Sequence, residues 1–439
     1  MKHSGPSGAG SSPERQISRL TTAWLIIIVL AIGALLSGFY FARSSGSNPQ
    51  AYGNDFNVYY HAACEVIAGR DPYQRSLGDW TPYIYPPLLA ELMVPFALLP
   101  LPVAAYFWFL ISATSIGGAA WMSARLATQG REVASGALQQ GIPKGYLWRA
   151  GIAAVAVVVV LRFVLDTFNL GQVNAVVVGL AVAHVYLYAR GRKALSVVAL
   201  VIAVSIKLTP GLLLVYHLAK LRLKFALACT GLVVAINVFS FLPFRANAVE
   251  VFRVFVSRTV KNEQGYDFAY SGNQSLRGAI ARLTDRENEA SPVGGTESRK
   301  PAEAVTLLTS IVLLAFAIFA AVRAQSDLGA AAPFFCCMVL FSPLSWKAHY
   351  VILLLPVAHL VSLVKTPGKA RYVISAALAI NFALFNLTSP RVIGLPAAQW
   401  ADAHSLVLIG ALLIYAASIA TVYNKAISLY GRPSLGAPR

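Results

Sequence analysis

Charged side chains are scarce in this 439-residue sequence. Asp, Glu, Lys and Arg supply 12% of the residues and hydrophobic residues supply 57%, whereas a soluble domain carries roughly 25% charged residues. That leaves too little polar surface to cover a water-facing body of this length. We therefore exclude a soluble protein. Because several apolar runs reach the ~20 residues needed to cross a bilayer, we also exclude a single anchor that carries a soluble domain.

Negative charge is scarcer than positive charge, with 18 Asp and Glu against 36 Lys and Arg and a net charge of +18. A basic chain invites a nucleic-acid partner, but such a partner needs the basic residues gathered in one patch or stripe. Here they are scattered through short loops between apolar runs, a pattern typical of topology determinants that face anionic lipid. We predict membrane lipid, and no nucleic acid, as a partner.

Paired-cysteine motifs and glycine-rich motifs are also missing. Of the four cysteines, Cys336 and Cys337 are adjacent in one apolar run, so no disulfide framework is expected, and no cysteine has the spacing of a zinc site. No glycine-rich phosphate loop is found either. We expect no cofactor, and if the protein uses a sugar donor, the missing loop is consistent with one that is not a nucleotide sugar.

The chain is rich in apolar runs. They predict an all-α fold, a polytopic bundle of about twelve transmembrane helices. The run 194–219 contains Lys207 and Pro210, so we expect a kinked helix or two half-helices there. The runs are 22–41, 84–100, 103–123, 149–165, 173–189, 194–219, 225–243, 304–323, 330–344, 348–364, 372–388 and 404–423.

Basic clusters divide the chain into three parts. The positive-inside rule assigns a basic arm, 1–21, and a tail, 425–439, to the cytoplasm, with a single membrane domain, 22–424, between them. Two long polar loops of that domain, 42–82 and 244–302, then lie outside a plasma or inner membrane.

One stretch leaves two topologies open. If the basic loop 124–148 is inside, 84–123 must cross the membrane an odd number of times. Either 84–100 is re-entrant, or that basic loop is outside.

The first outer loop carries a candidate catalytic carboxylate. Phe56, Tyr59, Tyr60 and Ala63 recur at helical spacing, so 55–68 is predicted to be a short interfacial helix opened by Asp55. The simplest role for Asp55 is that of an N-cap, and a catalytic role is the alternative.

Six short motifs, in order, carry a family resemblance. They are Asp55-x-x-Val58-Tyr59, Gly69-x-Asp71-Pro72-Tyr73 with Tyr85-Pro86-Pro87-Leu88, Gly171-Gln172-Val173-Asn174, Lys207-Leu208-Thr209-Pro210, Asn273-Gln274-Ser275, and Ser342-Pro343-Leu344-Ser345-Trp346 with His349. This order resembles glycosyltransferase family 87, over about residues 50 to 390.

The resemblance implies a fold and an activity. It implies a GT-C fold and the reaction of the polyprenyl-phosphate-mannose-dependent mannosyltransferases, on the outer face and without a metal. It further implies that Asp55 is the general base and His349 a second essential group. The late motif departs from the pattern with Trp346-Lys347-Ala348-His349, and the loop 285–300 is specific to this chain.

The residue types fit this chemistry independently. Inverting transfer from a phosphate needs a carboxylate to take the acceptor's proton, and Asp55 is our candidate. The leaving phosphate needs fixed positive charge. Lys207 is the first candidate, because a charged side chain within the membrane costs free energy and therefore marks a functional site by default. The alternative is that the lysine snorkels to the interface.

Further substrate-binding candidates are polar groups near the ends of apolar runs. Gln172 and Asn174 can donate to sugar hydroxyls or join two helices. For the others the alternative is an ordinary interfacial or solvated side chain. These others are Lys347, Tyr85, Asn273, Gln274 and Arg277.

Two functions from different classes emerge. The first is an inverting glycosyltransferase that moves a hexose, most readily mannose, from a polyprenyl-phosphate carrier to a lipid or glycan acceptor on the outer face. The second is a lipid or sugar transporter or flippase, in which Lys207, Arg162 and Asp166 would line a pathway.

Overall fold

The computed structural model describes residues 54–73, 83–134, 143–260, 268–284, 300–366 and 368–423. Within these ranges the chain is helical and has no strand, as the apolar runs predict. The predicted first span, 22–41, the predicted chain-specific loop 285–300 except for its last residue, and the tail 425–439 lie outside them.

Five helices among the described residues are long and apolar enough to cross a bilayer. They belong to α5 (Leu101–Ala134), α11 (Leu223–Phe239), α14 (Lys300–Arg323), α17 (Ala370–Phe382) with the π-turn η5 (Ala383–Leu387), and α20 (Leu406–Tyr423). A bent pair makes a sixth span if its two helices are counted as one. About twelve spans are therefore not confirmed, because most of the remaining apolar runs form helices of only 10–17 residues.

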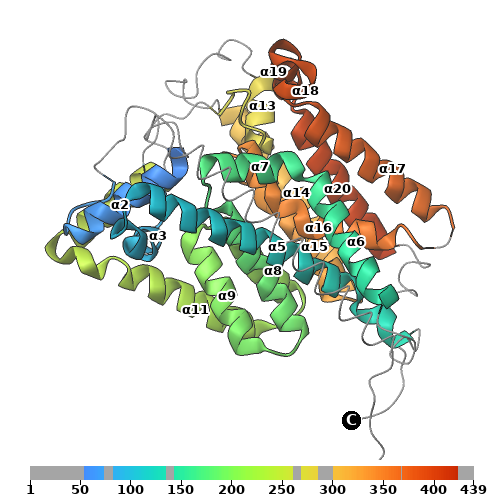
Figure 1. The fold of residues 1–439 in the computed structure, drawn as a ribbon, viewed down its shortest axis with the longest axis horizontal. Helices are drawn as coiled ribbons and strands as arrows, with labels where there is room; N and C mark the ends of the chain where they lie inside the picture. Colours follow the sequence, from blue (N-terminus) through green and yellow to red (C-terminus); the bar gives the residue numbers. More distant parts are fainter. Residues whose placement is uncertain are drawn as a thin grey trace, which may run out of the picture.

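The bent pair is α6 (Pro143–Val159) and α7 (Leu161–Leu170), which meet at 68°. A bend of this size frees backbone groups that must find other partners. The Asn386 side chain supplies them, since its amide nitrogen donates to the Val159 carbonyl at 2.9 Å and its oxygen accepts from the Arg162 N–H at 3.0 Å. As a result α7 runs across the bundle instead of along it (Figure 1).

Two buried helices form the centre of the bundle (Figure 1). Every residue of α15 (Asp327–Leu340) after its first is buried, and so is all of α16 (Leu354–Leu363). By contrast, only 17% of the span in α14 is buried. Helices that are apolar on all sides suit such a buried position.

Short helices surround the end of the bundle that α7 crosses. The helix predicted at 55–68 is present as α2, Asn54–Ile67. The run 84–100 forms only two short helices and no span, which fits the re-entrant alternative. The other elements are α3 (Pro87–Leu92), α4 (Val94–Ala97), α8 (Asn174–Ala189), α9 (Lys193–Ile206), η1 (Thr209–Gly211), α10 (Leu212–Ala219), η2 (Leu242–Asn247), α12 (Ala248–Phe255), η3 (Val256–Val260), α13 (Leu276–Thr284), η4 (Lys347–Leu353), α18 (Pro390–Ile393) and α19 (Leu395–Ala403).

Candidate active site

Asp55 lies in the first turn of α2, and neighbouring residues enclose it although part of its surface stays accessible. A close backbone contact sets the position of that turn. Gly171 has a left-handed backbone (φ +62°), and a Cβ atom built on it would lie 2.6 Å from the Cβ of Phe56. The Gly171 carbonyl also accepts a hydrogen bond of 2.8 Å from the Trp108 indole. Only glycine allows the end of α7 to approach α2 this closely.

Three hydrogen bonds connect Asp55 to Lys207. The Lys207 ammonium donates to the Asn174 Oδ1 at 2.8 Å, and the Asn174 amide nitrogen donates to the Gln172 Oε1 at 2.7 Å. The Gln172 amide nitrogen in turn donates to Asp55 Oδ2 at 2.7 Å. Both amides therefore point their nitrogen toward the carboxylate and their oxygen toward the ammonium, the orientation that suits both charges.

The helix pair α8 and α9 explains why Lys207 returns to this place. Asn174 is the first residue of α8, and Lys207 directly follows the last residue of α9. The two helices run antiparallel and have nearly equal lengths, 16 and 14 residues. Lys207 has an extended backbone (φ −148°, ψ 128°), so the predicted run 194–219 is broken at the lysine.

The pKa of Asp55 is raised to about 6. Burial is the main cause, because it disfavours the charged carboxylate, while the hydrogen bond from Gln172 and the charge of Lys207 lower the pKa. A carboxylate with a pKa close to neutral is well suited to accept a proton from a hydroxyl group. Oδ2 already accepts from Gln172, which leaves Oδ1 for this task.

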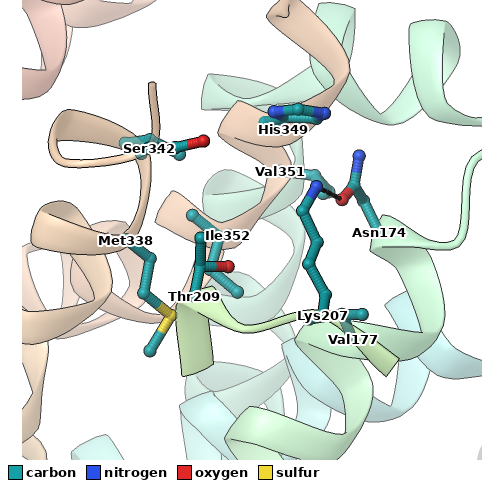
Figure 2. A pocket seen from close by; sticks show the side chains of 10 residues that line it. Asn174, Val177, Lys207, Thr209, Met338, Ser342, His349, Val351 and Ile352 are labelled. Carbon is teal, nitrogen blue, oxygen red and sulfur yellow. Dashed lines mark hydrogen bonds between the residues drawn. The ribbon is translucent and has the colours of Figure 1, made fainter. Parts of the chain in front are cut away.

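His349 and Lys207 line one small cavity of about 20 Å³, together with Asn174, Thr209 and Ser342. Figure 2 shows the Lys207 ammonium between the His349 ring and the Asn174 side chain. A cavity of this size holds about one water molecule or one oxygen atom of a larger group. Among the described residues, no hydrogen-bond partner reaches the buried Nδ1 atom of His349. The cavity is therefore lined both by a cationic residue and by a histidine with one unpaired ring nitrogen.

The Tyr85 side chain lies at the edge of an aromatic cluster next to α2. The Tyr59 hydroxyl donates to the Tyr85 hydroxyl at 3.1 Å and accepts from the Val173 N–H at 3.4 Å. Their rings meet edge to face, with centroids 5.2 Å apart. Tyr85 is thus linked through Tyr59 to the same α2 face that carries Asp55.

Asn273 and Gln274 lie elsewhere. The Asn273 side chain is fully buried and joins two loops, since it donates to the Phe268 and Pro343 carbonyls and accepts from the Ser275 and Ser345 N–H groups. All four of its hydrogen-bonding positions are thus used by the backbone. We do not include Asn273 in the site proposed below.

The Gln274 side chain has a similar role. Its amide nitrogen donates to the Ser271 carbonyl at 2.7 Å and to the Asp402 carbonyl at 2.9 Å. These bonds hold the loop before α13 against the end of α19, so we leave Gln274 out of the site as well.

The two other predicted cations have acidic partners. Lys347 forms an ion pair with Asp402. Arg277 donates to Glu303 at 2.7 Å and stacks over the Phe268 ring, with 3.6 Å from its guanidinium carbon to the ring centre. Neither cation lines the cavity of Lys207 and His349. In the described part of the chain, no three metal-ligating side chains gather in one place.

Sequence reasoning missed three site residues. Gly171 was part of a quoted motif, but its close contact with α2 depends on the tertiary structure. Thr209 and Ser342 also stood in quoted motifs, beside Lys207 and in the late motif, and both line the cavity. Their position directly next to predicted site residues was the available signal.

The fold and this site define a class of protein. It is a helical membrane protein in which a carboxylate with a raised pKa is linked by hydrogen bonds to a lysine that lines a small cavity. The chain belongs to glycosyltransferase family 87, since the model of that family matches residues 83–343, more than half of the chain. The match includes Gln172, Asn174 and Lys207, while Asp55 and His349 flank it. Family membership favours the enzyme over the transporter.

The chain is similar to mycobacterial mannosyltransferases. It is 26% identical over 359 residues to a polyprenol-phosphate-mannose-dependent alpha-(1-2)-phosphatidylinositol pentamannoside mannosyltransferase of Mycobacterium tuberculosis, which covers 81% of this chain and 75% of the relative. It is 29% identical over 384 residues to the polyprenol-phosphate-mannose-dependent alpha-(1-2)-phosphatidylinositol mannoside mannosyltransferase of Mycolicibacterium smegmatis, which covers 80% and 77%.

Gly171→Ala is expected to lower transferase activity at least tenfold. The added methyl group would push α2 away and move Asp55 from Gln172, and a displacement of about 1 Å can cost on the order of 10²-fold in rate. Gly69→Ala is the matched control, because Gly69 has a similar backbone (φ +67°) but no atom within 4 Å of the added Cβ. Transfer rates and thermal unfolding of both variants in detergent test this. Equal effects of the two substitutions would show that backbone strain, and not the contact with α2, matters.

Proposed function

We propose that this protein is an inverting mannosyltransferase that takes mannose from a polyprenyl-phosphate carrier and attaches it to a mannolipid acceptor. The observation that carries the proposal is the hydrogen-bonded chain from Asp55 to Lys207, which ends beside His349. The names of the similar enzymes support the choice of mannose, of a polyprenol-phosphate donor and of a phosphatidylinositol mannoside acceptor.

In the proposed step an acceptor hydroxyl attacks the anomeric carbon of the donor. Asp55 Oδ1 takes the proton of that hydroxyl as the new carbon–oxygen bond forms. The bond between the anomeric carbon and the phosphate oxygen breaks, and its electron pair leaves with the polyprenyl phosphate. Because phosphate is a stable anion, the leaving group needs no proton.

Lys207 and His349 are the proposed partners of the leaving phosphate. One phosphate oxygen would enter the cavity, where the ammonium and a ring N–H of His349 can bind it. Negative charge grows on this oxygen as the bond breaks, so these contacts strengthen in the transition state. The two amides hold base and cation in fixed relation to each other.

The arrangement of charges supports inversion. A retaining enzyme needs a second carboxyl group about 5 Å from the first to act as nucleophile. The charged neighbour that influences the pKa of Asp55 is instead Lys207. Direct attack by the acceptor, with inversion at the anomeric carbon, fits a single carboxylate.

The basic turns support a site on the outer face. α8 begins at the site and ends next to Arg190, and α10 begins at the site and ends next to Lys220. Both basic turns therefore lie at the opposite end of these helices. The positive-inside rule assigns that end to the cytoplasm.

The test uses purified protein in nanodiscs with polyprenyl-phosphate-mannose and a phosphatidylinositol mannoside acceptor. We expect release of polyprenyl phosphate together with an acceptor that has gained one hexose, and no product from GDP-mannose. If the protein releases no polyprenyl phosphate from donors that carry mannose, glucose or galactose, the proposal is overturned. Movement of the intact donor across the bilayer without bond cleavage would favour the transporter.

The rate is expected to rise with pH through about 6. Asp55 accepts a proton only when it is ionised, and its pKa is raised to about 6, so kcat/KM falls about tenfold per pH unit below that value. Gln172→Leu removes a hydrogen bond that lowers this pKa, and therefore moves the acid limb to higher pH. Initial rates between about pH 4.5 and 8.5 measure this. A limb that stays in place, or moves to lower pH, would contradict the role of Gln172.

A further inference from the structure

A second, larger cavity opens on the membrane-facing side of the bundle. It is a groove of about 410 Å³ between α14 and the end of α15. Leu307, Ile311 and Leu314 of α14 form one wall, and Leu340 and Phe341 contribute from α15 and the residue after it. The groove is therefore mainly apolar, and it is far larger than the cavity beside Lys207.

The groove lies on the surface that faces lipid. α14 contains a membrane-spanning helix, Pro301–Arg323, of which only 17% is buried. Leu307 and Ile311 are 62% and 54% exposed. In a membrane, a groove lined by such side chains is filled by hydrocarbon instead of water.

One end of the groove is polar. Arg277 and Glu303 line it and pair at 2.7 Å. Glu303 lies in the first turn of α14, which packs against α13 at the end of the bundle that α7 crosses (Figure 1). From Glu303 to Leu314 the helix rises about 16 Å, roughly half of the ~30 Å hydrocarbon core. The groove thus runs from a polar interface to about mid-membrane.

A short segment separates this groove from the active site. Met338, Val339 and Ser342 line the cavity beside Lys207 and His349, whereas Leu340, Phe341 and Pro343 line the groove. The same six residues therefore form a wall shared by both spaces. A lipid chain in the groove would therefore pack against the other side of the segment that bounds the proposed phosphate site.

We propose that this groove holds the prenyl chain of the donor. The inference rests on the proposed function and adds to it a place for the donor's tail. A groove of about 410 Å³ suits part of one prenyl chain better than the paired chains of a diacyl lipid. The wall shared with the cavity argues for the donor, since the donor carries the phosphate that Lys207 and His349 would bind.

The test fills the groove without altering the site. Ser310 lines the groove between Ile311 and Leu307 along α14, and Ser310→Trp places an indole in it. Leu308→Trp is the matched control, because Leu308 lies on the same helix, is 63% exposed and does not line the groove. Each variant is assayed with a long-chain and a two-isoprene mannosyl phosphate donor, and thermal unfolding verifies the fold. Ser310→Leu serves as a milder substitution if the tryptophan variant fails to fold.

We expect the wild type to have at least a tenfold lower KM for the long-chain donor than for the short one. Ser310→Trp should raise the long-chain KM at least tenfold, leave the short-chain KM and both kcat values unchanged, and differ in this from Leu308→Trp. Equal KM values for the two donors in the wild type, or no change on filling the groove, would overturn the proposal while the proposed function stands. A raised KM for the acceptor instead would assign the groove to the acceptor's acyl chains. If the wild type cleaves neither donor, the proposed function itself fails, and the groove proposal with it.

Discussion

Asp55→Asn is expected to lower kcat by about 10² to 10⁴-fold, the usual cost of losing a general base. The asparagine oxygen can still accept the hydrogen bond from Gln172, so α2 keeps its position and the protein still folds and inserts. An amide, however, has no basic oxygen to take the acceptor's proton. Release of polyprenyl phosphate under saturating substrate, together with thermal unfolding, measures the two effects separately.

Asp71→Asn is the control for this experiment. Asp71 is a second carboxylate of the same polar segment, 42–82, and its Oδ1 accepts from the Tyr73 N–H at 2.9 Å. An asparagine can form the same bond, so we expect a rate within a few-fold of wild type. A rate for Asp55→Asn within about tenfold of wild type would refute its role as the base.

Lys207→Met is expected to lower kcat by about 10² to 10³-fold, as loss of one transition-state donor does elsewhere. Methionine keeps an apolar stem of similar length but has no charge to stabilise the leaving phosphate. The KM for the acceptor should change little, because the contact is made to the donor. Lys207→Arg should restore activity only in part, since a planar guanidinium does not reproduce the geometry of an ammonium.

Lys193→Met is the matched control for the lysine. Lys193 is the exposed first residue of α9. Its substitution therefore removes the same charge from the opposite end of the same helix. It should leave polyprenyl phosphate release unchanged. If Lys207→Met also leaves release unchanged at saturating and subsaturating donor, Lys207 is only an interfacial anchor.

The number of spans could not be predicted from hydrophobicity. α14 and α15 are both strongly apolar, but most of α14 faces outward and α15 is buried on all sides. Hydropathy alone does not distinguish lipid from protein as the neighbour of an apolar side chain. The break at Lys207 and the helix α2 were predicted correctly, because a lysine and a proline within a run, and a helical repeat of aromatic residues, are local signals.

The site was predictable only as a set of unusual residues. Asp55, Lys207 and His349 stand out because polar groups are rare near apolar runs. Their partners are not visible in the sequence. Gln172 and Asn174 were expected either to contact sugar or to join two helices, and the structure shows in addition that their side-chain amides link Asp55 to Lys207. The Lys347 pair with Asp402 joins residues 55 positions apart, a contact that only the tertiary structure determines.

The short inner helices have a consequence for biogenesis. α15 has 14 residues and is thus about 21 Å long, well below the ~30 Å of the hydrocarbon core. Alone in a bilayer, such a helix would leave its terminal backbone groups in hydrocarbon without hydrogen-bond partners. It therefore cannot remain in the membrane by itself while the ribosome completes the chain. We expect α15 to leave the insertion machinery only when the longer α14 can shield it. The buried central helix would then enter the membrane together with its neighbours.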